Sequence, residues 1–188
     1  MMRNFAIAVL ALGGTLPAAA AVESYTADPA HTFPGFEISH GGDFTITRGF
    51  FQKTTGKITL DREAKTGSIE IIVDAASMST GHQARDTIVR ATYLKVDQFP
   101  HMIFRSTHVK FAGDIPSGAD GELLLAGVTR PVSLAITSFK CRPHPVNKKQ
   151  QCGADGTALI RRSDFGLNAV SSVGDDIRIL FQIESYKD

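Results

Sequence analysis

Residues 177–183 read IRILFQI, with an apolar side chain at every second position from Ile177 to Ile183. Successive side chains of a β-strand point to opposite faces, so this stretch predicts a strand with one apolar face. The same period recurs along the chain and, with two less regular segments, predicts about eight strands. The predicted strands are residues 36–40, 49–60, 69–74, 102–106, 123–127, 132–136, 156–162 and 177–183.

Short turns separate the predicted strands. Residues 61–67 and residues 113–121, the latter with Pro116, predict hairpin turns, and Val173-Gly174-Asp175 introduces the last strand. Short connections imply that neighbouring strands are antiparallel. Because each strand has an apolar face, the sheet must pack against a second sheet or close on itself as a barrel.

One segment, from Thr80 to about Lys95, breaks the period of two. Its apolar residues are irregularly spaced, and Ser79 or Thr80 precedes them as a candidate N-cap. The segment therefore predicts a short helix. We expect this helix to cover one end of the sheet if the sheet is closed.

The N-terminus has the features of a secretory signal peptide. Arg3 precedes an apolar run at residues 5–16, which Pro17 and four alanines follow. The run is too short to cross a bilayer unaided. We expect residues 1–21 to be a signal peptide and residues 22–188 to be one secreted domain, periplasmic where the source has two membranes. An uncleaved N-terminal anchor is the alternative.

Charge and cysteine content narrow the class of protein. The 188 residues carry a net charge of +1, and residues 1–21 hold Arg3 and no acid, so the expected mature chain is neutral. Such a chain does not favour nucleic acid as a partner. Cys141 and Cys152 are expected to form a disulfide in an oxidising compartment. A thiolate metal site would need more ligands than the nearby His144, so we predict no metal site.

Common catalytic signatures are absent from the sequence. It has no Gly-x-Ser-x-Gly elbow, no glycine-rich phosphate loop and no pair of histidines at helical metal spacing. The six histidines are scattered along the chain. His31 lies three residues after Asp28, and both a structural hydrogen bond and a catalytic dyad stay open for this pair.

Charged residues in the predicted helical segment and at one predicted strand end are candidates to bind a polar head group. Arg85 and Asp86 are adjacent in the helical segment, where they form either a surface pair or a polar contact at a barrel mouth. Arg161 and Arg162 lie at a strand end. Neighbouring residues of a strand point to opposite faces, so one of these arginines is expected to face inward.

The chain has 12 phenylalanines and no tryptophan. Several of them, such as Phe36, Phe104 and Phe181, occupy the alternating apolar positions. They either fill a core or line a cavity, because a barrel of about eight strands is near the size at which both arrangements occur.

A set of short motifs, taken in order, resembles the YceI-like family, which is named for polyisoprenoid binding and is similar in shape to lipocalins. The resemblance runs from about Tyr25 to Ile183. The motifs are Asp28-Pro29-Ala30-His31, His40, residues 49–51 with 56–58, Ser77 with Thr80, Arg85-Asp86, residues 96–100 with 104–106, residues 121–123, 127–132 and 162–166, and Gly174-Asp175.

The resemblance implies an all-β, eight-stranded antiparallel barrel with a short helical cap. It implies an apolar tunnel for a polyisoprenoid lipid (a polyprenyl phosphate, pyrophosphate or quinone) and no catalytic residue or cofactor. Candidate head-group contacts are His31, His40, Arg85, Asp86 and Arg162. Strand parity predicts the tunnel-lining residues Phe36, Ile38, Phe51, Ile58, Ile69, Ile71, Val73, Phe104, Leu123, Leu125, Val132, Leu134, Ile160, Phe165, Ile177, Ile179 and Phe181.

Three functions stay open from the sequence. The first is a carrier that transports or stores a polyisoprenoid, and the second is a scavenger of other amphiphiles under stress. The third is an enzyme that acts on an isoprenoid head group, which requires His31, His40, Asp86 and an arginine in one cleft. The native ligand, transient membrane contact and a homodimer are not determined by the sequence.

Overall fold

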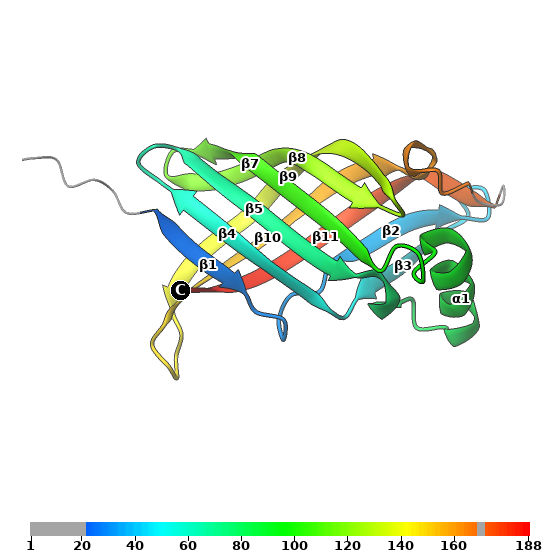
Figure 1. Ribbon diagram of the computed structural model, residues 1–188, viewed down its shortest axis with the longest axis horizontal. Helices are drawn as coiled ribbons and strands as arrows, with labels where there is room; N and C mark the ends of the chain where they lie inside the picture. The colour runs from blue at the N-terminus through cyan, green and yellow to red at the C-terminus, as the bar shows by residue number, and fades with distance from the viewer. Residues whose placement is uncertain (1–21, 169–171) are drawn as a thin grey trace, which may run out of the picture.

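The computed structural model describes residues 22–168 and 172–188, so the predicted signal peptide at residues 1–21 lies outside the described residues. Antiparallel strands make up most of this part of the chain (Figure 1). The strands are β1 (Glu23–Ala27), β2 (Gly35–His40), β3 (Thr45–Phe51), β4 (Thr54–Asp61), β5 (Thr66–Asp74), β6 (Met78–Ser79), β7 (His101–Ala112), β8 (Ile115–Leu125), β9 (Val128–Pro143), β10 (Gln150–Arg161) and β11 (Val173–Lys187). The helical segments are η1 (Ala75–Ser77), α1 (Gln83–Ile88), η2 (Val89–Leu94) and η3 (Arg162–Phe165).

The sheet closes on itself through β1. This strand pairs with β4 on one side and with β11 on the other, and the ring continues through β5, β7, β8, β9 and β10. Within the described residues these strands form a closed antiparallel barrel of eight strands. β2 and β3 continue the sheet from β11 toward the end that α1 covers, here called the helical end (Figure 1). The predicted eight-stranded barrel with a short helical cap is confirmed.

The first strand of the barrel was not predicted. The first predicted strand, at residues 36–40, corresponds to β2, whereas β1 precedes Asp28-Pro29-Ala30-His31 and these four residues form a turn. In that turn the Asp28 carboxylate accepts a hydrogen bond from the backbone N–H of Ala30 at 2.9 Å. Buried Tyr25 and Ala27 do alternate with exposed Thr26, but over a strand of only five residues, too short for a clear period.

The hairpin turn predicted at residues 113–121 is wrong. Gly113 and Asp114 alone connect β7 to β8, and Pro116 lies within β8. Gly113 has a φ of 63°, a conformation that glycine adopts without steric cost, so two residues suffice for the turn. The strand predicted at residues 123–127 ends early for a similar reason, because residues 126–127, both with positive φ, form the turn to β9.

The strand predicted at residues 49–60 is two strands, β3 and β4. The hydroxyl of Ser77 accepts hydrogen bonds from the backbone N–H groups of Gln52 and Lys53, each at 3.1 Å. The N–H groups of these two residues therefore donate to Ser77 and not to a neighbouring strand. Ser77 is 24 and 25 positions away in sequence, so the local pattern does not reveal the break.

The predicted helix is present within residues 80–95 but begins later than expected. α1 continues directly into η2, which is a π-helical segment. The N-cap is His82, whose Nδ1 accepts a hydrogen bond from the Arg85 backbone N–H at 3.3 Å. The prediction of Ser79 or Thr80 as the cap is wrong, because the hydroxyls of both residues hydrogen-bond to a buried carboxylate instead.

Two apolar clusters fill the interior. The larger cluster includes Met78 and Leu94 at the helical end and Phe104 in the middle of the barrel. The smaller cluster consists of Tyr25, Leu60, Val109 and Cys152, with further side chains packed against it, and fills the opposite end. We call this the disulfide end.

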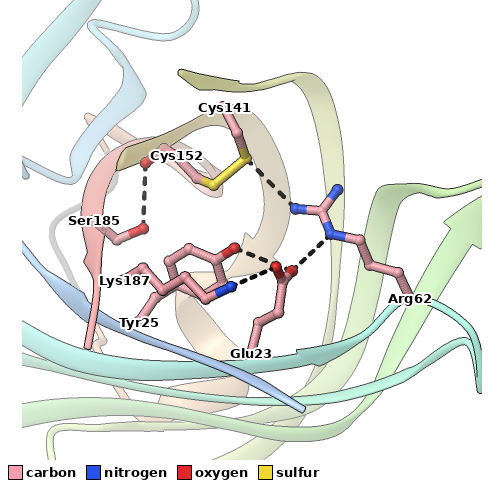
Figure 2. The surroundings of a disulfide bond; sticks show 7 residues. All are labelled: Glu23, Tyr25, Arg62, Cys141, Cys152, Ser185 and Lys187. Atoms are coloured by element: carbon pink, nitrogen blue, oxygen red, sulfur yellow. Dashed lines mark hydrogen bonds and ion pairs between the residues drawn. A yellow bond between two sulfur atoms is a disulfide. The ribbon is translucent and has the colours of Figure 1, made fainter. Parts of the chain in front are cut away.

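Charged groups lie beside Tyr25 and the disulfide at this end of the barrel (Figure 2). The carboxylate of Glu23 accepts hydrogen bonds from Arg62 Nε at 2.8 Å, from Lys187 Nζ at 2.9 Å and from the Tyr25 hydroxyl at 3.1 Å. Burial opposes ionisation of this carboxyl, but the three donors outweigh burial and hold the pKa of Glu23 below its usual value. The disulfide end is therefore covered by a connected polar layer.

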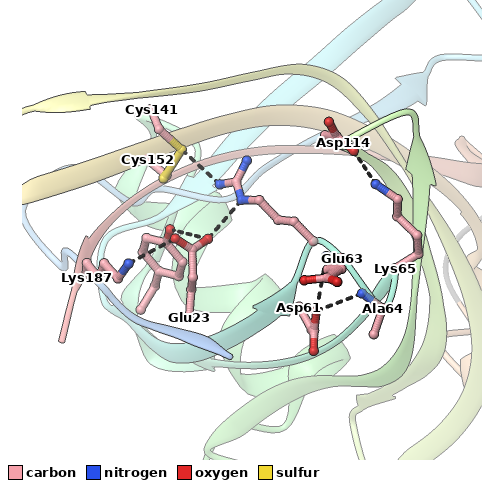
Figure 3. Close-up of polar contacts among 11 residues, drawn as sticks. Glu23, Asp61, Glu63, Ala64, Lys65, Asp114, Cys141, Cys152 and Lys187 are labelled. Atoms are coloured by element: carbon pink, nitrogen blue, oxygen red, sulfur yellow. Dashed lines mark hydrogen bonds and ion pairs between the residues drawn. A yellow bond between two sulfur atoms is a disulfide. The ribbon is translucent and has the colours of Figure 1, made fainter. Parts of the chain in front are cut away.

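The predicted disulfide is confirmed. It joins Cys141 of β9 to Cys152 of β10, which are paired directly across the two strands. The turn that follows β4 and the turn between β7 and β8 lie at the same end, where Lys65 forms an ion pair with Asp114 (Figure 3). These contacts tie neighbouring hairpins together at the disulfide end.

Candidate functional site

An apolar cavity of about 280 Å³ lies inside the barrel and reaches the helical end. Its wall comes from side chains of β2, β3, β5, β6, β7, β8, β9, β10 and β11, together with α1 and η2. The volume is close to the lower end, roughly 300 Å³, of the range for small-molecule sites in proteins.

The wall consists mainly of alternate residues on the inward face of each strand, as β11 shows most clearly. Ile177, Ile179, Phe181 and Ile183 all border the cavity, whereas Arg178 between the first two is exposed. The wall of β11 extends from residue 173 to residue 183, which is roughly 33 Å along the strand at about 3.3 Å per residue. The cavity is therefore elongated along the barrel.

The structure places most of the predicted lining residues at this wall. They come from eight of the strands and were all identified by their position on the alternating apolar face. The residues at the wall are Phe36, Ile38, Phe51, Ile71, Val73, Phe104, Leu123, Leu125, Val132, Leu134, Ile160, Ile177, Ile179 and Phe181.

Three predicted lining residues lie elsewhere. Ile58 and Ile69 pack between the larger and the smaller cluster, nearer the disulfide end than the cavity. Parity gives the side of the sheet on which a residue lies, but not its depth in the barrel. Phe165 is buried in the core from η3, where the period of two does not apply.

Several wall residues were not predicted. Met102 and Ile183 belong to the alternating segments of the sequence, so the same parity rule identifies them. Met78, Tyr93 and Leu94 come from β6 and η2, which fold over the helical end. No local period marks these three residues, because their position depends on the path of the chain across the opening.

Polar wall residues gather at the helical end, and we call this rim the mouth. It contains Ser39, His40, Thr47, Thr80, Arg85 and Arg162. Of the predicted head-group contacts, His40, Arg85 and Arg162 therefore lie at the cavity. His31 and Asp86 do not border it.

Asp86 is buried, and its carboxylate binds the segment that precedes α1. It accepts hydrogen bonds from the Thr80 backbone N–H at 2.9 Å, from the Thr80 hydroxyl and from the Ser79 hydroxyl at 3.3 Å. Burial opposes ionisation, but these donors outweigh it and hold the pKa of Asp86 below its usual value. Arg85 Nε donates to the Thr80 hydroxyl at 2.7 Å. The two residues thus hold the start of the helix, and only Arg85 borders the cavity.

Arg162 faces inward and Arg161 faces solvent, as the alternation predicted. Arg162 Nε donates to the carbonyl of Gly174 at 3.1 Å, and its other nitrogens donate to the carbonyls of Leu167 and Val173. These bonds tie η3 to the start of β11. The guanidinium therefore has a structural role at the mouth.

His31 lies on the exposed turn between β1 and β2. Its Nδ1 is 2.8 Å from the Asp28 carboxylate, and this hydrogen bond raises the pKa of His31 above its usual value. His31, His40 and Asp86 do not share one cleft, since the cavity borders only His40 among them. The predicted cluster of His31, His40, Asp86 and an arginine in one cleft is therefore not formed.

Within residues 22–168 and 172–188, no group of three or more His, Cys, Asp or Glu side chains is placed to hold a metal ion. No helix in these ranges is long and apolar enough to span a membrane.

A closed antiparallel barrel with an elongated apolar cavity and a polar mouth defines a lipocalin-like binding-domain fold. The chain belongs to the YceI-like family, because the family model of the YceI-like domain matches residues 25–185.

Relatives and solved structures agree with this family. The chain is 32% identical over 187 residues to a UPF0312 protein of Pseudomonas putida (strain W619), with 96% of each chain covered. Its fold is similar to that of BcnA from Burkholderia cenocepacia, with a TM-score of 0.66, 20% identity, and 84% of this chain and 98% of that chain covered. It is also similar to a polyisoprenoid binding domain from Saccharophagus degradans implicated in plant cell wall breakdown, with a TM-score of 0.64, 15% identity, and coverage of 87% and 98%.

Proposed function

We propose that this protein binds a polyisoprenoid lipid in the barrel cavity and transports or stores it outside the cytoplasm. The elongated apolar cavity, with its polar wall residues at the helical end, carries the proposal. The similarity in fold to the polyisoprenoid binding domain from Saccharophagus degradans adds support. The ligand class comprises polyprenyl phosphates, polyprenyl pyrophosphates and isoprenoid quinones.

The cavity suits a ligand with a long apolar tail and a small polar head. The tail lies along β11 toward Ile183, and the head group lies at the mouth beside His40 and Arg85. Removing each methylene group of the tail from water contributes roughly 0.8 kcal/mol. A tail of several isoprene units therefore binds tightly without any catalytic group.

Two features support a location in the periplasm. Residues 1–16 have the charge and apolar run of a signal peptide, and alanines follow at residues 18–21. The disulfide between Cys141 and Cys152 is expected to persist in an oxidising compartment. We therefore place the lipid-bound protein between the membranes of a two-membrane cell.

The first experiment identifies the bound lipid. The protein is purified from its native host, extracted with organic solvent and examined by mass spectrometry. We expect one polyprenyl species at about one molecule per protein chain. An empty barrel that takes up many unrelated amphiphiles with similar affinity would refute the carrier and favour a scavenger.

A pair of variants tests whether the lipid occupies the cavity. Ile179→Trp places a larger side chain at the cavity wall, whereas Leu159→Trp changes the exposed outer face of β10, where Leu159 is 66% exposed. We expect Ile179→Trp to lose most of the extractable lipid and Leu159→Trp to retain it. Equal lipid content in the two variants, both shown to be folded by circular dichroism, would place the ligand outside the cavity.

A further inference from the structure

Three large apolar side chains are exposed around the mouth. Phe44, at the tip of the hairpin between β2 and β3, is 85% exposed, and Ile46 follows it on β3. Ile88, the last residue of α1, is 56% exposed. We call Phe44, Ile46 and Ile88 the mouth surface. Large apolar side chains gathered at one place on a protein surface mark an interaction site.

The mouth surface flanks the cavity on two sides. Thr47, the neighbour of Ile46, borders the cavity, so Ile46 points to the outer face of β3. Arg85 and Val89, on either side of Ile88 in sequence, also border the cavity. The hairpin between β2 and β3 and helix α1 lie at the same end of the long axis of the molecule (Figure 1).

We propose that the mouth surface docks on a lipid bilayer and so turns the mouth of the cavity toward the membrane. The inference rests on the proposed lipid-binding function. A polyisoprenoid tail that leaves the cavity passes between the two flanks of the mouth surface. If a bilayer covers these flanks, the tail moves from one apolar environment to another without exposure to water. A bilayer is also the place where a water-insoluble lipid resides, which favours a membrane over a protein partner as the occupant.

The charges near the mouth surface fit the head-group region of a bilayer. Arg48 follows Ile46 on the outer face of β3 and forms an ion pair with Glu37 at 2.7 Å. Glu37 also lies 3.7 Å from Arg178, so two guanidinium groups share one carboxylate. Asp43, which precedes Phe44 in the hairpin, offsets the second guanidinium, and such mixed charges beside exposed apolar side chains suit the polar head-group region of a bilayer.

A single-tryptophan experiment tests the docking. The chain contains no tryptophan, so Phe44→Trp introduces one reporter at the mouth surface. Val146→Trp is the matched control, because Val146 is 82% exposed in the loop between β9 and β10 at the disulfide end. With vesicles of phosphatidylethanolamine and phosphatidylglycerol carrying brominated acyl chains, we expect a blue shift and quenching for Phe44→Trp and neither for Val146→Trp. Quenching of both reporters to the same extent, or of neither, overturns the proposal.

Loss-of-contact variants give an independent readout. In sedimentation with the same vesicles, we expect Phe44→Ser and Ile88→Ser each to weaken binding by about tenfold and Val146→Ser to leave it unchanged. Equal binding by all three variants and the wild type contradicts the proposal.

Lipid extraction from the same wild-type protein separates the hypothesis of membrane docking from the hypothesis of lipid binding in the cavity. Docking with an empty cavity contradicts the proposed function alone, and a lipid-filled protein that does not bind vesicles contradicts the docking alone.

Discussion

At the scale of single residues, Asp86 is the best example of a polar side chain that holds the mouth in place. Asp86→Ala would leave half-buried donors of Ser79 and Thr80 without their acceptor. We expect the free energy of unfolding to fall by about 2 kcal/mol. Urea denaturation measures this change, and a variant as stable as the wild type would show that water replaces the carboxylate.

The lowered pKa of Asp86 predicts a pH dependence. A carboxyl whose pKa is lower in the folded state stabilises the fold above its unfolded pKa, near about 3.9, and loses this contribution as the pH falls through the folded pKa. We therefore expect the stability advantage of the wild type over Asp86→Asn to be constant near neutral pH and to shrink below about pH 4. Urea denaturation of both proteins across this range tests the sign. An advantage that grows toward acid contradicts the assigned ionised state.

Gly156 permits a close approach of backbone and aromatic ring at the cavity wall. A Cβ atom at this position would lie 2.1 Å from Phe181 Cζ and 2.2 Å from the Ala135 carbonyl oxygen. We expect Gly156→Ala to lower the free energy of unfolding by about 2 kcal/mol and to displace the Phe181 ring. Gly153→Ala is the control on the same strand, because its nearest contact would be 3.9 Å away. Equal stability of the two variants in urea denaturation would argue against this packing.

At the scale of elements, the hairpin of β9 and β10 depends on the disulfide. Replacing Cys141 and Cys152 together by alanine opens a loop with a sequence separation of 11, and we expect a loss of up to about 3 kcal/mol in the free energy of unfolding. Hydrogen exchange should become faster in β9 and β10 near these residues, with little change in α1. Uniformly faster exchange along the chain would mean that the disulfide stabilises the whole barrel instead.

The elements also differ in how well the local pattern predicts them. The long strands β7, β9 and β11 contain their predicted segments and extend beyond them. β1 was missed because five residues show too little of the period, and the break between β3 and β4 was missed because Ser77 causes it from a distance. The turn at residues 113–114 needs only one glycine. The further glycines and the proline of residues 115–121 lie within β8, so they made the predicted turn too long.

At the scale of the whole molecule, a ligand that binds only the folded barrel stabilises the entire fold. A polyprenyl phosphate at a free concentration of 100 times its dissociation constant is expected to raise the free energy of unfolding by about 2.7 kcal/mol. Thermal unfolding should therefore shift upward as ligand is added to lipid-free protein. Ile179→Trp should show little of this shift, because its added ring occupies the cavity. An equal shift in this variant would indicate a binding site outside the barrel.

From the sequence alone, the period of two predicted antiparallel strands and the inward face of most of them, the two cysteines predicted the disulfide, and the resemblance to the YceI-like family implied the closed barrel. The strand faces depend on local information, because the period of two is present within each segment and a strand exposes alternate residues to one face. The wall positions on β11, such as Ile177 and Ile179, follow from this rule alone. Membership of the YceI-like family agrees with the ordered motifs along the same chain.

The tertiary structure decided how these faces enclose a site. β1 closes the ring by pairing with β4 and β11, and residues of β6, α1 and η2 complete the cavity wall at the helical end. The tertiary structure also decided how far along the barrel each inward-facing residue lies. Ile58 and Ile69 pack toward the disulfide end, whereas Ile71 borders the cavity. These outcomes depend on contacts between residues far apart in the chain. A local period specifies the side on which a residue lies, and only the closed barrel specifies its neighbours and its distance from the mouth.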